Sequence, residues 1–209
     1  MTQRSIEKRH QIVEVAIKLF LSQGVQGTSM RDIANAIGTS AANLYYYFRS
    51  KDEIIDSVAE LGVRSVNVTR DYYRSLGNIS PTEALRKCIV QMILSPDHDR
   101  ILFFNREYRS LSPARGSELM ATVRQYISFF EHIVDEGIRA GEFKMDNAKL
   151  VAFNIYISQQ EWALRRWLLR DTLTAEEFAE QQADFILRSI CVSNHPQARE
   201  PGSKSTGGM

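Results

Sequence analysis

The sequence of 209 residues predicts an all-α protein, with a three-helix unit over residues 1–50, a larger helical body over 51–193 and a disordered tail over 194–209. Two observations predict this class. Apolar residues recur at helical spacing along nearly the whole chain, and no segment alternates as a strand does. Glycine, proline and helix-capping residues divide the periodic segments into about nine helices. The tail is rich in Pro, Gly and Ser and has almost no apolar residue, so it lacks what a packed core needs.

The first two helices are predicted from apolar positions at helical spacing. The first covers about residues 5–23 and ends at Gly24. The second follows Thr28 or Ser29, whose hydroxyl caps it, and Asp32 places negative charge in its first turn. The apolar positions are Val13, Ala16, Ile17 and Phe20 in the first helix, and Met30, Ile33, Ala34 and Ile37 in the second.

The third helix is short and crowded with tyrosines. Gly38 supplies the chain reversal before it, Ser40 caps it, and Leu44 and Phe48 form its buried stripe. Three successive tyrosines over residues 45–47 cannot all be buried on one short helix, so some hydroxyls face solvent, where they can bond to phosphates. This layout is that of a helix-turn-helix, whose second helix enters the major groove of DNA.

Six further helices are predicted in the body, each bounded by a cap or a breaker. Ser50 caps a helix that runs to about Leu76, and Pro81 starts the next. Residues 95–97 and Pro113 separate the following helices. The later boundaries are a stop near Gly141, a cap at Asp146 or Asn147 for a helix that reaches about Leu169, and a capping box of Thr174 with Glu177 for a last helix over about 175–192.

Charge is unevenly distributed along a chain whose net charge is +1. Residues 1–51 hold seven Lys and Arg against three Asp and Glu, whereas the remainder holds 19 against 22. A basic head on a mildly acidic body is typical of a DNA-binding module attached to a part that does not bind DNA.

Several other classes of protein are not indicated. No run approaches the ~20 apolar residues of a membrane span, and the chain start lacks an apolar signal core, so we expect a cytoplasmic protein without membrane contact. Cys88 and Cys191 lie in apolar helical patterns, as buried thiols do. The histidines are scattered, and no phosphate-binding loop or catalytic serine motif is present, so neither an enzyme nor a metal or cofactor site is expected.

The N-terminal motif resembles that of the TetR family of one-component bacterial repressors. The similarity covers about residues 9–55 and is carried by Phe20, Gly24, the run Thr28-Ser29-Met30-Arg31-Asp32-Ile33-Ala34, Gly38, Leu44-Tyr45, Phe48 and Ser50-Lys51-Asp52-Glu53. One departure is the pair Ala41-Ala42, where the family often has a longer side chain, so base reading must come from other positions.

Three segments of the body are similar to TetR-family members that sense acyl-CoA thioesters in lipid or sterol catabolism. They are residues 107–112, 138–143 and 162–167. This resemblance implies a ligand-responsive repressor that is released from DNA by a small amphipathic effector such as an acyl-CoA.

The DNA contacts are predicted from the two short helices. Arg31 is placed to reach guanine, or alternatively a phosphate or Asp32, and Asn43 is placed to pair an adenine edge or to remain solvated. Tyr45 and Tyr46 are expected at phosphates or thymine methyl groups, and Ala41 lies beside them on the recognition helix. Backbone anchors are expected at Ser29, Ser40 and Lys51. Tyr47 either joins them or packs against the first helix.

The predicted ligand site centres on one face of the helix over 147–169, where Asn154, Ser158, Trp162 and Arg166 recur every four residues. An aromatic surface with an arginine suits an amphipathic guest with an anionic head. Opposing walls are expected from the two preceding helices, through Phe103, Phe104, Glu107, Tyr108, Tyr126, Phe129 and Phe130. The alternative is that the aromatic residues are plain core and the arginines pair with nearby glutamates.

The last two helices carry more apolar surface than one small core needs, and we expect them to form a homodimer through a four-helix bundle. A dimer also fits the geometry of DNA, because two recognition helices must lie ~34 Å apart to enter successive major grooves. Two alternatives for function stay open: a regulator of efflux genes that senses hydrophobic compounds, and a DNA-binding protein without an effector.

Overall fold

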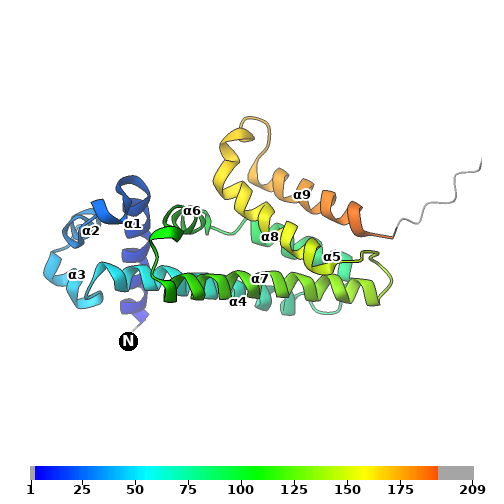
Figure 1. Cartoon of the computed structure of the whole chain (residues 1–209), viewed down its shortest axis with the longest axis horizontal. Coiled ribbons are helices and arrows are strands. Elements are labelled where there is room, and N and C mark those ends of the chain that lie inside the picture. The colour runs from blue at the N-terminus through cyan, green and yellow to red at the C-terminus, as the bar shows by residue number, and fades with distance from the viewer. Residues whose placement is uncertain (1–2, 193–209) are drawn as a thin grey trace, which may run out of the picture.

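A computed structural model describes residues 3–192, which form nine α-helices and two short 3-10 helices (Figure 1). The predicted all-α class is confirmed, and the predicted tail over 194–209 lies outside the described residues. The α-helices are α1 (Gln3–Gly27), α2 (Met30–Ile37), α3 (Ala41–Tyr47), α4 (Lys51–Ser75), α5 (Pro81–Ile93), α6 (His98–Glu107), α7 (Pro113–Arg139), α8 (Ala148–Arg165) and α9 (Ala175–Ile190), and the 3-10 helices are η1 (Tyr108–Ser110) and η2 (Arg166–Leu168).

The helix starts follow the local capping chemistry. Ser29, Ser40, Ser50, Asn147 and Thr174 each accept a hydrogen bond from a backbone N–H of the helix that follows. Two boundaries differ from the sequence prediction. Helix α1 breaks at Gly24, where φ is 78°, but a further short turn continues to Gly27. Helix α8 ends at Arg165 and tightens into η2 instead of reaching Leu169.

Helix α4 joins two hydrophobic cores. The head core contains apolar side chains of α1, α2 and α3, the first half of α4, and Phe103 and Phe104 of α6. Phe20 and Phe103 pack with their ring centroids 5.6 Å apart, so α6 of the body is docked directly on the head. The second half of α4 lies along α7, and Figure 1 shows this pair running from the head to the far end of the body.

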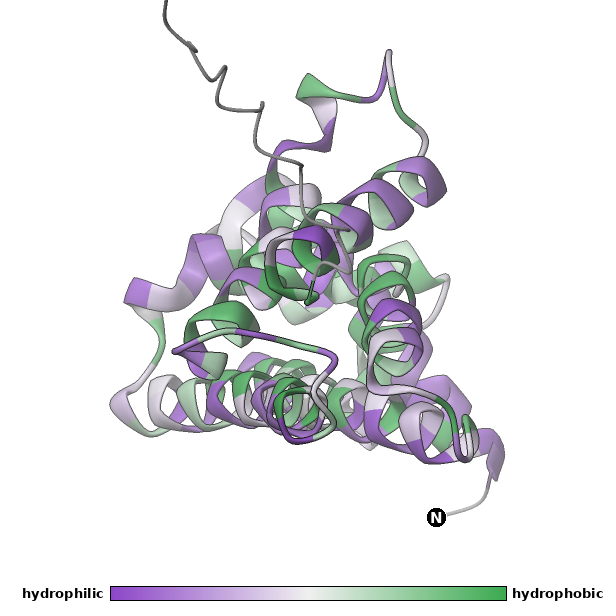
Figure 2. Cartoon of the chain, turned by 90° about the vertical axis from the view of Figure 1, so that its right-hand side faces the viewer, coloured by the Kyte–Doolittle hydropathy of each residue, from purple (hydrophilic) through white to green (hydrophobic). Residues whose placement is uncertain are grey.

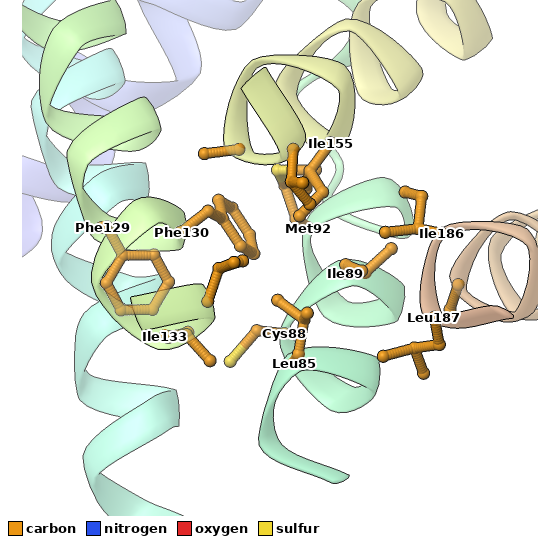
Figure 3. Close-up of a cluster of buried hydrophobic side chains, with 14 of the residues drawn as sticks. Leu85, Cys88, Ile89, Met92, Phe129, Phe130, Ile133, Ile155, Ile186 and Leu187 are labelled. Atoms are coloured by element: carbon orange, nitrogen blue, oxygen red, sulfur yellow. The ribbon is translucent and has the colours of Figure 1, made fainter. Parts of the chain in front are cut away.

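The body core lies between α5, α7, α8 and α9 (Figure 3). Leu85, Cys88 and Ile89 of α5 are fully buried in it and lie between the side chains of α7 and those of α9. Viewed from the far end, the hydrophobic surfaces of these helices face one another (Figure 2). None of the helices within residues 3–192 has both the length and the apolar content that crossing a membrane requires.

Candidate DNA-binding and ligand-binding sites

Helix α3 is held on the head by two fully buried side chains, Leu44 and Phe48. Gly38 has φ 73°, a left-handed conformation that few other residues adopt readily, and it turns the chain between α2 and α3. Ser40 Oγ then accepts from the backbone N–H of Asn43 at 3.1 Å. The turn and the two buried residues fix the direction in which the rest of α3 faces.

Several residues predicted to contact DNA lie on the outer side of this unit. Tyr45 is 51% exposed and Tyr46 is 80% exposed, and Arg31 of α2 is also exposed. Asn43 is exposed and its Nδ2 donates to Thr39 Oγ1 at 2.7 Å, so its amide is oriented before any DNA is bound. Ala41 is half-buried beside the head core. The structure thus brings together guanidinium, amide and phenol groups on one small unit.

Tyr47 takes the packed alternative. It is half-buried against the head core, and its ring meets that of Tyr46 edge to face at 5.1 Å. Its backbone carbonyl accepts from Arg9 Nη1. The guanidinium of Arg9 lies 3.9 Å from the centroid of the Phe48 ring and 3.4 Å from Glu53 Oε1. Arg9 therefore joins α1, the end of α3 and the start of α4, a role that the sequence analysis did not predict because these residues are far apart in the chain.

Two of the predicted backbone anchors have partners inside the chain. Lys51 Nζ donates to the carbonyl oxygens of Val25 and Thr28, the latter at 2.9 Å, and so ties α4 to the corner between α1 and α2. Ser29 forms a reciprocal capping box with Asp32, whose pKa is lowered by the hydrogen bonds from the side chain and the backbone of Ser29. Both residues hold the shape of the unit, whatever contact they make with DNA.

A cavity of about 250 Å³ lies between α4, α6, α7 and α8. Three of the predicted wall residues, Phe104, Tyr108 and Tyr126, line it. The other lining residues are Gly62, Arg100, Ile101, Asn105, Leu119, Met120, Thr122, Val123, Tyr156, Gln159 and Gln160. Most of this wall was not predicted, because the cavity surface of α6 and α7 depends on how these helices rotate about their axes. Gln159 and Gln160, two adjacent amides between the apolar positions of α8, were the available signal.

Four other predicted wall residues lie away from the cavity. Phe103 is fully buried in the head core, and Phe129 and Phe130 are buried in the body core. Glu107 Oε1 lies 3.6 Å from Nε of Arg106. The structure therefore uses the three phenylalanines as core, which was the alternative left open for the aromatic residues.

The polar face predicted on α8 contacts α9 and does not line the cavity. Ser158 Oγ donates to the carbonyl of Asn154 at 2.8 Å and accepts from Gln182 Nε2 of α9 at 2.9 Å. Trp162 stacks on Phe178 of α9 with a centroid distance of 4.5 Å, and its Nε1 has no hydrogen-bond partner. This face of α8 thus packs on α9, and the cavity is lined by a different face with Tyr156, Gln159 and Gln160.

Arg166 is exposed at the end of α8 and lies close to α6. Its Nη1 is 3.1 Å from Nδ1 of His98, whose Nε2 is 3.2 Å from the carbonyl oxygen of Ile93. Burial lowers the pKa of His98, and the charge of Arg166 lowers it further, against the raising effect of the Ile93 hydrogen bond. Arg166 therefore contacts a neutral imidazole and is not one of the residues that line the cavity.

A polar cluster lies where the cavity meets α4. Arg100 Nη2 is 2.6 Å from Asp97 Oδ2 and donates to Ser65 Oγ of α4 at 3.0 Å. Asp97 Oδ2 also accepts from Ser65 Oγ and, at 2.9 Å, from Ser95 Oγ. The side chains of Arg100 and Asp97 are 11% and 18% exposed, respectively. Across residues 3–192, no three His, Cys, Asp or Glu side chains are grouped as metal ligands.

Two protein-family models match the chain. The model described as bacterial regulatory proteins of the tetR family matches residues 12–58, and the tetracyclin repressor-like C-terminal domain matches residues 78–190. Together they cover most of the described residues and leave out the start of α1 and the second half of α4.

Individual relatives agree with this assignment. The HTH-type transcriptional repressor KstR2 of Mycobacterium tuberculosis is 24% identical over 188 residues, which cover 88% of this chain and 92% of the relative. A solved structure of the ketosteroid transcriptional regulator KstR2 of the same organism has a TM-score of 0.71 at 25% identity, covering 89% and 96% of the two chains. AibR in complex with isovaleryl coenzyme A and operator DNA has the same fold, with a TM-score of 0.70 at 21% identity and coverage of 85% and 96%.

Proposed function

Because the chain belongs to the TetR family of bacterial regulatory proteins, we propose that it is a transcriptional repressor that binds a palindromic operator as a homodimer and leaves it when a small amphipathic effector fills the cavity. The observation that carries this proposal is that one helix, α4, belongs to both sites. Its first half packs in the head core, and Gly62 in its middle lines the cavity.

At the DNA end, α3 enters the major groove with Tyr45 and Tyr46 toward the sugar-phosphate backbone or thymine methyl groups. Arg31 and Asn43 supply the base contacts, since both are exposed and carry the donor patterns that guanine and adenine edges accept. Ser40 and Ala41 allow the start of α3 to approach closely, because both are small. Ser29 and Lys51 lie at the corners of the unit, where they meet phosphates in addition to their contacts within the chain.

At the other end, the last two helices form the dimer. Leu150 and Phe153 of α8 are 53% and 45% exposed, and Phe185 of α9 is 70% exposed. Large apolar side chains left exposed on two neighbouring helices are typical of a protein interface. A two-fold axis through this surface presents two copies of α3 to one side of the duplex, as a palindrome requires.

The effector that we propose is an acyl-CoA of lipid or sterol catabolism, with its acyl part between Phe104 and Tyr126 and its polar part toward the opening of the cavity. The wall supports this choice, because apolar and aromatic side chains are interspersed with amides and phenols. One neighbour in fold, AibR, is described as a complex with isovaleryl coenzyme A.

Release from DNA is a shift between two arrangements of α4. Arg100 bonds to Ser65 of α4, so a guest that moves Arg100 or pushes on Gly62 displaces α4. Because α4 is packed into the head core, its displacement moves the two DNA-binding units relative to each other. The effector must bind the DNA-incompetent arrangement more tightly for this to occur.

The test is to sequence the DNA that the purified protein retains from a random pool, and then to measure release by candidate acyl-CoA esters and by the corresponding free acids. We expect one palindromic sequence to be enriched and an ester to release it. A matched control is Val123→Trp, which fills the cavity from α7 and is expected to preserve DNA binding while abolishing release.

The possible outcomes separate the candidate functions. Release by an uncharged hydrophobic compound and by no thioester supports a regulator of efflux genes. If the protein retains DNA and no compound shifts its thermal unfolding transition, a DNA-binding protein without an effector is supported. A protein that enriches no sequence overturns the proposed function.

A further inference from the structure

The cavity wall contains one charged side chain among its described residues, that of Arg100. A lone guanidinium in an apolar pocket is the usual means of holding a carboxylate or a phosphate. The charge class of the guest therefore depends on whether the positive charge of Arg100 is available to it.

The charge of Arg100 is already neutralised. Its Nη2 lies 2.6 Å from Asp97 Oδ2, and both side chains are largely buried. Asp97 is held in turn by the hydroxyl groups of Ser65 and Ser95. Three partners from α4, the α5–α6 connection and α6 thus fix the carboxylate beside the guanidinium. Arg100 therefore lines the cavity with its counter-ion already in place, and Asp97 lies behind it, outside the lining residues.

The remaining polar groups of the wall are neutral. Burial, together with the charge of Asp97, raises the pKa of the Tyr126 hydroxyl to about 12, and burial raises the pKa of Tyr156. Gln159 Nε2 donates to the carbonyl of Met92 at 2.8 Å, so its amide is held by a backbone group of α5. These side chains offer hydrogen bonds but no compensation for a buried negative charge.

A carboxylate that enters such a site loses its hydration and meets the charge of Asp97. Moving an ionised group out of water costs several kcal/mol unless a partner of opposite charge is free. An ester, a thioester or an amide of the same skeleton carries no such cost and uses the same phenol and amide groups.

We propose that Asp97, by occupying Arg100, makes the cavity select the neutral acyl group of an ester, thioester or amide and reject the free carboxylic acid. The inference rests on the proposed function, since it concerns the same effector site, and it assigns Asp97 as the specificity-determining residue. A repressor built in this way responds to the activated form of an acid and ignores the acid itself.

The experiment compares two probes of nearly equal shape, 4-phenylbutanamide and 4-phenylbutyrate, by isothermal titration at neutral pH. For the unaltered protein we expect the amide to bind about tenfold more tightly or better. In Asp97→Asn the guanidinium becomes free while the hydrogen-bonding shape is retained, and we expect the ratio to fall by about tenfold or to reverse.

Two control variants are available. Asp99→Asn removes one negative charge from the same turn of α6 without touching the Arg100 pair, and Ser95→Ala removes one hydrogen bond to Asp97 without changing its charge. Both are expected to keep the preference for the amide.

Equal binding of acid and amide to the unaltered protein overturns the proposal, as does an Asp97→Asn ratio equal to that of Asp99→Asn. If neither probe binds, or if Val123→Trp binds both as well as the unaltered protein does, the cavity is not the effector site. That result contradicts the proposed function together with this inference, whereas the first two results leave the proposed function intact.

Discussion

Helix α3 and the α8–α9 pair both leave aromatic side chains in solvent, but the chemistry of those side chains differs. On α3 they are Tyr45 and Tyr46, which carry hydroxyl groups, and on α8 and α9 they are Phe153 and Phe185, which do not. A tyrosine can pack its ring on apolar parts of a nucleic acid and donate a hydrogen bond from its hydroxyl to a phosphate. An exposed phenylalanine has only an apolar ring, which gains free energy when another apolar surface covers it. The difference is the one that the proposed roles require, with a DNA surface at α3 and a dimer surface at α8 and α9.

The largest expected effect is a loss of folding stability when a buried residue that anchors α3 is removed. Phe48→Ala removes a fully buried ring beneath the Arg9 guanidinium and is expected to lower the free energy of unfolding by about 3–5 kcal/mol. Tyr46→Ala on the same unit is expected to change it by less than about 0.5 kcal/mol while weakening DNA binding. Chemical denaturation and DNA titration of both variants give the answer. Equal losses of stability would remove the distinction between anchor and contact.

The second effect concerns the phenylalanine surface. Phe185→Glu places a charge at the most exposed apolar position of α9 and is expected to weaken the dimer by roughly 2–4 kcal/mol, because the carboxylate must be desolvated in the interface. Sedimentation equilibrium measures the change. The conservative variant Phe185→Leu is expected to remain dimeric. A Phe185→Glu protein that associates as before would place the dimer surface elsewhere.

A third prediction separates the roles of two cations of the DNA-binding unit, Arg31 and Lys51. Arg31→Ala is expected to lower operator affinity by about 1–3 kcal/mol and to relax preference at one base pair. Lys51→Ala is expected to weaken all sequences about equally and also to lower the melting temperature, because the carbonyls of Val25 and Thr28 lose a donor. Fluorescence anisotropy with single-base variants of the operator distinguishes them. An Arg31→Ala protein with unchanged base preference would show that Arg31 is not a reading residue.

The smallest effect concerns the body core and its dependence on pH. Burial raises the pKa of the Cys88 thiol from 9.0 to about 12, so above pH 9 the unfolded chain loses this proton while the folded chain keeps it. Stability is therefore full below pH 9 and is lost as pH rises, by up to about 1.4 kcal/mol per pH unit for one proton. Cys88→Ala is expected to flatten the decline between pH 9 and 10, and urea titrations over this range measure it. An unchanged slope would mean that the thiol titrates no differently in the folded state.

The head could be predicted from the sequence almost residue by residue, and the reason is that its signals are local. Ser29, Gly38 and Ser40 fix the caps and the turn within a few residues of chain, and Leu44 and Phe48 fix the orientation of α3. The short turn after Gly24 and long-range contacts such as that of Arg9 with Phe48 were not predicted.

The cavity was less predictable, because its wall depends on the rotation of whole helices. The spacing of Ser158 and Trp162 correctly placed them on one face of α8, but nothing local shows that this face meets α9 and not the cavity. The pairing of Arg100 with Asp97 was also missed, since residues 95–97 were predicted only as a break between two helices.

Methylation protection of the selected operator tests the central claim most directly, because guanine N7 lies in the major groove. Two protected patches are expected on one side of the duplex, one for each copy of α3 in the dimer, separated by about one helical turn or a multiple of it. A single patch, or bound DNA with no protected guanine N7, would contradict the claim.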